Sequence, residues 1–221
     1  MFHPNDNPLD RGWVGRIEDD RMLHLAAQTL QSFFLVGGGS RVHAEYPLAD
    51  VTLVVPVQYP PTVRLFDGTG SFRFANATAV IGPNVPVAGT SLTARGRIAV
   101  VIGAGGEIGG TTALLEWHDP AEQLDVKRSD FALVLGPVVV TPDETATSSF
   151  ACRLSAGTRT VEGVPAVFSW AEALELAAHR TMLRPGDVIA GPPVVVLEGV
   201  DADAELDVDG IGALACPLGA S

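Results

Sequence analysis

Two arginines that stand two residues apart on a predicted strand are the most informative chemical feature of the chain. Residues 98–103 are apolar and β-branched, which is typical of a buried strand, and Arg95 and Arg97 lead into them. Side chains two apart on a strand point to the same face of the sheet. Two guanidinium groups side by side on such a strand either pair with acidic side chains or hold an anion.

One pair of neighbouring side chains further along the sequence could move protons. His118 and Asp119 directly follow a second predicted strand at residues 113–117, and imidazole and carboxylate groups are common general acids and bases. The other histidines are scattered without the spacing of metal ligands, and the chain has no P-loop, Rossmann fingerprint or nucleophile elbow. His118 is therefore the histidine of interest.

The elements that must position these residues are mostly short strands separated by turns. Twenty-four glycines and sixteen prolines fit many tight turns. One strong helix is predicted to begin at an N-cap, Ser169, with Glu172 completing a capping box, and to end before Pro185. A hairpin and a short helix precede residue 50, so we expect a small N-terminal appendage at residues 1–50 and a main domain at residues 51–221.

Composition and charge exclude several classes of protein. The net charge of −12 argues against nucleic acid or an anionic membrane as a partner, and no apolar stretch is long enough to span a bilayer. Cys152 and Cys216 lack a framework pattern, which favours reduced thiols. No secretory signal is recognisable at the N-terminus, and the expected location is the cytoplasm.

Six motifs spread along the chain carry a resemblance to a known family. They are A-V-I-G-P at residues 79–83, T-A-R-G-R-I-A-V-V-I-G at 93–103, K-R-S-D-F-A-L-V-L-G-P at 127–137, V-V-V-T-P-D-E at 138–144, L-R-P-G-D-V-I-A at 183–190 and E-L-D-V-D-G-I-G-A-L-A-C-P-L at 205–218. In this order they resemble motifs of the fumarylacetoacetate hydrolase superfamily. The resemblance implies a mixed α/β, mostly β fold of the fumarylacetoacetate hydrolase type and, because family members are commonly homodimers, a homodimer.

The resemblance also shows what is missing. In the family, two glutamates bind Mg²⁺, Ca²⁺ or Mn²⁺, and here their positions fall on Arg95 and Arg97, while the counterpart of a third acidic residue is Asp119. One guanidinium about 4 Å from a charge costs or gains roughly 4 kcal/mol per unit charge at an effective dielectric near 20, so two of them repel a divalent ion strongly. We therefore expect no metal and no other cofactor. An alternative register would restore Mg²⁺ or Mn²⁺.

Other site residues follow from the same resemblance. Lys127 matches a family lysine that contacts the substrate's oxyanion, although a surface lysine is an equal alternative. Gly191 and Pro192 stand in the loop that lines the family's substrate site, whose threonine is missing here. The segment 63–74, where the family has a catalytic His and Glu, has neither, and its only acid, Asp67, stands in an ordinary turn sequence.

Three hypotheses for function remain. The first is a metal-independent enzyme or binding protein for a small anionic oxo acid or enolisable dicarbonyl, acting by tautomerisation, decarboxylation, hydration, cyclisation or C–C cleavage. Arg95 and Arg97 would hold the anion, Lys127 would stabilise negative charge, and Asp119 or His118 would move protons. The second is an inactive protein with a structural or regulatory role, in which an arginine pairs with Asp119. The third is an ordinary metal-dependent hydrolase or isomerase.

Overall fold

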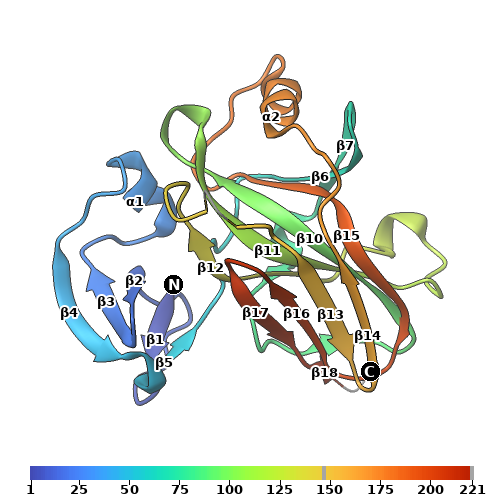
Figure 1. Cartoon of the computed structure of the whole chain (residues 1–221), viewed down its shortest axis with the longest axis horizontal. Helices are drawn as coiled ribbons and strands as arrows, with labels where there is room; N and C mark the ends of the chain where they lie inside the picture. The colour runs from blue at the N-terminus through green and yellow to red at the C-terminus, as the bar shows by residue number, and fades with distance from the viewer. Residues whose placement is uncertain (146–147, 220–221) are drawn as a thin grey trace.

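The protein, described here from a computed structural model covering residues 1–145 and 148–219, is built mainly from two packed β-sheets (Figure 1). The larger sheet has the order β7-β6-β15-β10-β11-β12-β8, and the smaller has the order β14-β13-β16-β17. The larger sheet comprises β6 (Val63–Gly68), β7 (Ser71–Ala75), β8 (Val80–Ile81), β10 (Leu92–Ile102), β11 (Ile108–His118), β12 (Leu133–Val140) and β15 (Val188–Val200). The smaller comprises β13 (Cys152–Ala156), β14 (Arg159–Gly163), β16 (Ala204–Val208) and β17 (Gly212–Cys216). The predicted mostly β fold is confirmed.

The remaining elements are short. The N-terminal part contains β2 (Gly15–Glu18), β3 (Arg21–Leu25) and β4 (Val42–Pro47) in one sheet, the pair β1 (Phe2–Pro4) and β5 (Val51–Leu53), and α1 (Leu30–Leu35). The main helix is α2 (Trp170–Ala178), and β9 (Val87–Ala88) pairs with β18 (Leu218–Gly219). Four 3-10 turns are η1 (Leu48–Asp50), η2 (Ala77–Ala79), η3 (Ala104–Gly106) and η4 (Asp125–Lys127). None of the helices in the described ranges is both long enough and apolar enough to cross a membrane.

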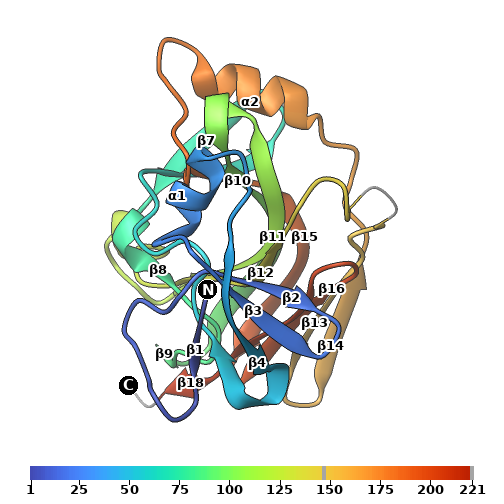
Figure 2. The same cartoon turned by 90° about the vertical axis from the view of Figure 1, so that its left-hand side faces the viewer.

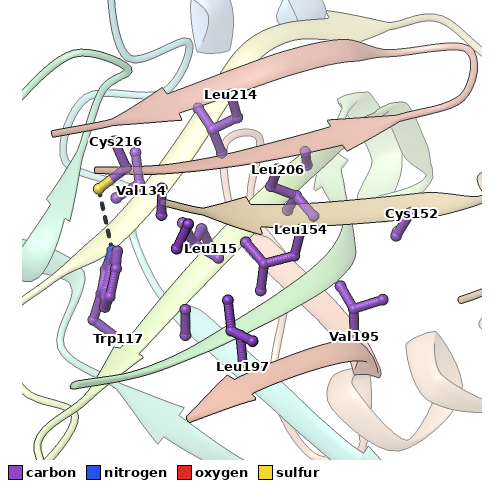
Figure 3. Packing of buried hydrophobic residues seen from close by; sticks show 14 of the residues in the cluster. Leu115, Trp117, Val134, Cys152, Leu154, Val195, Leu197, Leu206, Leu214 and Cys216 are labelled. Carbon is purple, nitrogen blue, oxygen red and sulfur yellow. Dashed lines mark hydrogen bonds between the residues drawn. The ribbon is translucent and has the colours of Figure 1, made fainter. Parts of the chain in front are cut away.

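The main hydrophobic core lies between the two sheets (Figure 3). Leu115 and Val134 of the larger sheet pack with Leu154 and Leu206 of the smaller, and all four are fully buried. Successive side chains of a strand point to opposite faces, so every second side chain of the smaller sheet points into this core. The residues of β16 are accordingly buried and exposed in alternation.

The two cysteines are free and buried in this core. Trp117 Nε1 donates a hydrogen bond to Cys216 Sγ at 3.2 Å (Figure 3). Burial raises the pKa of Cys152 to about 12 and that of Cys216 to about 11. Both thiols are therefore protonated and unreactive at neutral pH.

Strand β10 is the central element of the larger sheet, and its two neighbours differ in regularity. Along β11 the pairing is regular from Thr93 to Val101 and places Arg95 opposite Glu116. Along β15 the register shifts, so that Arg97 lies opposite Pro193 while Ala99 lies opposite Ala190. Proline has no N–H to give to a ladder, and the two residues between these pairs, Gly191 and Pro192, are left out of it. The carbonyl of Gly191 is thereby free for another donor.

Helix α2 covers one end of the larger sheet (Figure 1). Its N-cap is Ser169, as predicted, and the Ser169 hydroxyl accepts a hydrogen bond from the Glu172 N–H at 3.3 Å. The reciprocal bond of a full capping box is absent from the hydrogen bonds of the described residues, so that part of the prediction is wrong. Ala173 and Ala177 form the buried stripe of the helix.

The N-terminal segment is attached to the rest through both pairing and packing. Strand β1 pairs with β5, which lies beyond residue 50, and the sheet of β2, β3 and β4 lies beside α1 (Figure 2). Phe34 of α1 belongs to the same buried cluster as Leu65 and Leu133 of the larger sheet. The division into residues 1–50 and 51–221 stays a prediction.

Several element boundaries differ from expectation. Strand β15 is continuous through its irregular middle, which does not break the pairing at either end. The strands that were not predicted are β1, β4, β7, β9, β13 and β18. The Gly-rich sequence after Asp67 is a tight turn as expected, and it joins β6 to β7.

Candidate functional site

The candidate site is centred on Glu116, a fully buried carboxylate in the middle of a sheet. Its Oε2 atom lies 2.8 Å from Arg97 Nε and 2.7 Å from Arg97 Nη2. Its Oε1 atom accepts a hydrogen bond from Arg73 Nη2 and lies 3.6 Å from Arg95 Nη1. One carboxylate is therefore surrounded by three guanidinium groups, from β7 and β10.

Arg97 is itself fully buried, and each of its five N–H groups has an acceptor. Besides the two contacts with Glu116, Nη1 donates to the carbonyl of Phe66 at 2.7 Å and to that of Gly191 at 3.0 Å, and Nη2 donates to Asp67 Oδ1 at 2.7 Å. The irregular part of β15 supplies the Gly191 carbonyl. This geometry leaves no N–H of Arg97 for a substrate. Of the two alternatives for the arginines, pairing with acidic side chains is therefore the one that applies to Arg97.

Asp67 is the second acid of the cluster, at the end of β6. Its Oδ2 atom lies 3.6 Å from Arg73 Nε. Partial burial raises the pKa of Asp67, but the hydrogen bond from Arg97 and the charges of Arg97, Arg73 and Arg95 together bring it below its ordinary value. Three guanidiniums against two carboxylates leave the cluster with one net positive charge.

Arg95 differs from Arg97, although both were predicted to share a face. The side chain of Arg95 is 31% exposed, and its single ion pair within the described chain is the 3.6 Å contact with Glu116. Its guanidinium donates no hydrogen bond to any residue that the structure describes. Arg95 is thus a largely buried cation whose donors are available to a ligand.

His118 lies on the same strand as Glu116, two residues further along, and so on the same face of the sheet. Its Nδ1 atom is 3.0 Å from the hydroxyl of Ser129. Burial and then the positive charge of Arg95 lower the pKa of His118 below 6.5, and the opposing effect of Glu116 is smaller. His118 is therefore neutral at neutral pH.

Two other predicted residues lie outside the arginine cluster. Asp119 Oδ1 accepts a hydrogen bond from the Ala121 N–H at 2.8 Å, and the expectation that an arginine pairs with Asp119 is wrong, because Glu116 occupies that position. Lys127 is 52% exposed and forms an ion pair with Asp130. Of the two alternatives for Lys127, a substrate contact or a surface lysine, the structure shows the surface lysine.

The remaining predicted residues, Gly191 and Pro192, line a cavity of about 150 Å³ together with Phe168 and Trp170. A second cavity of about 310 Å³ lies between the turn after β6 and helix α2, with Phe66 and Phe168 in its wall. Each cavity has one lining residue whose backbone carbonyl accepts a hydrogen bond from Arg97, which is Gly191 in the first and Phe66 in the second.

The donor set does not fit a divalent metal ion. The described residues include no group of three His, Cys, Asp or Glu side chains arranged to hold a metal. The two carboxylates of the cluster, Glu116 and Asp67, already bind guanidiniums, and each of these cations would repel a divalent ion.

Sequence reasoning missed Glu116, Arg73 and Ser129. The available signal for Glu116 was a single acid within a run of buried apolar residues in β11, which a buried strand tolerates only if the charge is paired. Arg73 gave no signal, because it comes from the unpredicted strand β7.

Comparison with known proteins places the fold. The chain matches maleylpyruvate hydrolase from Sphingobium sp. SYK-6, solved in complex with manganese(II) ion and pyruvate, with a TM-score of 0.79 and 21% identity over 96% of this chain and 97% of the other. It also matches 2-hydroxyhepta-2,4-diene-1,7-dioate isomerase from Mycobacterium marinum, with a TM-score of 0.77 and 21% identity over 95% and 93% of the two chains. No family model and no curated protein matches the sequence. The chain therefore has the fold of the fumarylacetoacetate hydrolase superfamily, as its motifs predicted.

Proposed function

We propose that the protein binds a small carboxylate, of the oxo-acid class, through a guanidinium group in place of a metal ion. The observation that carries this proposal is Arg95, whose guanidinium is largely buried and has no hydrogen-bond acceptor among the described residues. A planar guanidinium matches a carboxylate with two parallel hydrogen bonds. The oxo-acid class is suggested by the fold, because the similar maleylpyruvate hydrolase was solved with pyruvate.

The charge of the cluster supports the same ligand. Glu116 and Asp67 neutralise two of the three guanidiniums, and the remaining positive charge lies at the partly exposed edge formed by Arg73 and Arg95. An incoming carboxylate would complete the neutralisation. A divalent cation would add to the excess, which is the basis for proposing that binding is independent of metal.

An inactive protein is the second candidate, and the saturation of Arg97 favours it. All the donors of this arginine are used inside the protein, and Lys127 is paired on the surface. In this case Arg95 would serve only to balance Glu116. The two candidates differ in whether a carboxylate binds at Arg95.

Binding of pyruvate to the purified chain, followed by calorimetry in the presence of EDTA, tests the proposal. We expect saturable binding that weakens about 10-fold to 100-fold in Arg95→Gln, because a charge-assisted hydrogen bond contributes roughly 1.5–3 kcal/mol. Arg153→Gln is the matched control, since Arg153 is an exposed arginine of β13 paired with Glu162. Equal pyruvate binding by the wild-type protein and Arg95→Gln, or no binding at all, would refute the proposal.

A second arm of this experiment replaces EDTA with Mn²⁺. We expect neither stoichiometric Mn²⁺ binding nor tighter pyruvate binding. Stoichiometric uptake of Mn²⁺ by the wild-type protein would restore the metal-dependent alternative. The homodimer and the cytoplasmic location remain proposals that rest on sequence.

A further inference from the structure

We propose that His118 is the residue that transfers a proton to and from the bound carboxylate ligand, and that Ser129 is the positioning residue that orients it. This inference rests on the proposed function, because it takes the ligand to be anchored at Arg95. The observation behind it is the contact of 3.0 Å between His118 Nδ1 and Ser129 Oγ beside the arginine cluster.

The register of the sheet places His118 close enough to Arg95 for both side chains to reach one small ligand. Arg95 pairs with Glu116, and the next residue on the same face of β11 is His118, so Arg95 and His118 are diagonal neighbours. Diagonal neighbours on one face lie roughly 7–8 Å apart. A carboxylate held by the Arg95 guanidinium can thus present a carbon one or two bonds away to the imidazole ring.

The contact with Ser129 orients the ring and is compatible with either tautomer, because a hydroxyl can accept from Nδ1 or donate to it. When Nδ1 donates its proton to the Ser129 oxygen, Nε2 carries the lone pair and is free to act as a base. Ser129 comes from the segment between β11 and β12, which returns alongside β11 through the hydrogen bond from the Asp119 N–H to the Arg128 carbonyl. The imidazole is therefore held between a strand and its neighbouring loop.

The surrounding charges keep this base neutral. The charged groups that act on His118 are Arg95 of β10, Arg73 of β7, Arg128 of the following loop and Glu116 of its own strand. Burial and the three arginines lower the pKa of His118, and Glu116 raises it. An anion bound at Arg95 would offset one of these cations, so the bound ligand itself makes His118 a stronger base.

The other candidate bases are less suitable. Both oxygens of Glu116 are bonded to guanidiniums in a fully buried position. The pKa of Asp67 is lowered, which weakens it as a base. Lys127 and Asp119 are engaged elsewhere.

The step is a reversible enolisation. Nε2 of His118 takes a proton from the carbon next to the ligand's carbonyl, the C–H bond breaks, and its electron pair moves onto the carbonyl oxygen to give an enolate. The developing negative charge lies beside the net positive cluster, which stabilises it. Return of the proton from the imidazolium to carbon or to oxygen gives the ketone or the enol, and no other reactant is consumed.

Exchange of the C3 protons of 2-oxobutanoate with deuterium in D₂O, followed by NMR with the full chain and EDTA, tests this step. We expect exchange well above the protein-free rate, a loss of about 100-fold or more in His118→Gln, and no change in the control His3→Gln. Ser129→Ala should slow exchange and move its pH profile, whereas Ser129→Thr, which keeps the hydroxyl, should restore both. Undiminished exchange in His118→Gln would overturn the inference.

Two further measurements keep the outcome clear. Binding of 2-oxobutanoate to the wild-type protein without exchange would overturn this inference and leave the proposed function intact, whereas no binding would remove both. If His118→Gln fails to fold, the wild-type rate still provides the test. It should fall as pH drops below the His118 titration midpoint in the 2-oxobutanoate complex, measured by NMR, and a rate indifferent to that titration would contradict the role of His118.

Discussion

Glu116 and Arg97 show how a charged cluster can stand inside an apolar sheet. A buried ion is costly unless its partners supply both opposite charge and hydrogen bonds. Here the carboxylate has guanidiniums on both oxygens, and Arg97 has an acceptor for every N–H. Removal of one member leaves the others buried without compensation.

Arg97→Ala is therefore predicted to destabilise the protein by about 3–5 kcal/mol, the usual cost of breaking a buried pair from one side. The free energy of unfolding in urea measures this cost. Arg153→Ala removes an exposed arginine of β13 and should cost less than about 1 kcal/mol. Similar losses for the two variants would show that Glu116 is neutral or solvated in the folded protein.

A second buried arginine, Arg64, provides a comparison at the same scale. It lies 3.7 Å from Asp187 and over the rings of Phe72 and Phe74, and its Nε atom has no hydrogen-bond partner among the described residues. An ionised group with an unsatisfied donor stabilises less than a fully bonded one. The contrast indicates that full hydrogen bonding, more than burial, distinguishes Arg97.

At the scale of elements, the long strands could be predicted from the sequence. The contacts between their side chains could be predicted only in part. The apolar runs of β10, β11 and β12 indicate buried strands directly. The bond from Arg97 to the Gly191 carbonyl depends on the shifted register of β15, a tertiary property without a local sequence signal. The resemblance points to Asp119, whereas the acid opposite Arg95 is Glu116, and sequence alone does not fix which residue of β11 takes that place.

Helix α2 depends on its N-cap, since it has only nine residues. Ser169→Ala is predicted to cost about 1 kcal/mol of stability, because the Glu172 N–H loses its acceptor. Ser169→Asp, which keeps an acceptor and adds charge at the helix N-terminus, should cost little or nothing. Thermal unfolding of the three proteins measures the difference, and equal melting temperatures would mean that the cap contributes nothing.

The N-terminal sheet contains a pH-sensitive group. His24 of β3 stacks on Trp13 with ring centroids 4.5 Å apart and meets the ring of His43 edge-on. Burial and then the nearby His43 lower the pKa of His24 below 6.5. A lowered pKa means that the folded state favours neutral His24, so its contribution to stability is fully present above pH 6.5 and declines as pH falls from there towards the folded-state pKa.

NMR titration of His24 is predicted to give a midpoint below 6.5. His43→Gln should raise that midpoint, because it removes the second charge, and should reduce the loss of stability on acidification. A midpoint of His24 that is unchanged by His43→Gln would leave burial as its sole cause.

At the scale of the whole molecule, the sequence predicts two separate regions, but the structure shows residues of both in one buried cluster. The turn-rich start of the chain suggests a separate appendage at residues 1–50, yet β1 pairs with β5 and Phe34 packs with Leu65 and Leu133. Sequence patterns indicate where one local element ends and the next begins. They do not indicate which elements pack into the same hydrophobic core. Shared burial implies that the two regions lose their structure together.

We therefore predict a single cooperative unfolding transition for the whole chain. Hydrogen exchange measured by mass spectrometry across a urea series should show peptides from β3 and β10 becoming exposed at the same urea concentration. Phe34→Ala should lower stability by about 3–5 kcal/mol and move both peptides together, because it leaves a cavity in the shared core. The adjacent Leu35 is 65% exposed, and Leu35→Ala should change stability by less than about 0.5 kcal/mol. Earlier exposure of β3 than of β10 would instead establish residues 1–50 as an independent unit.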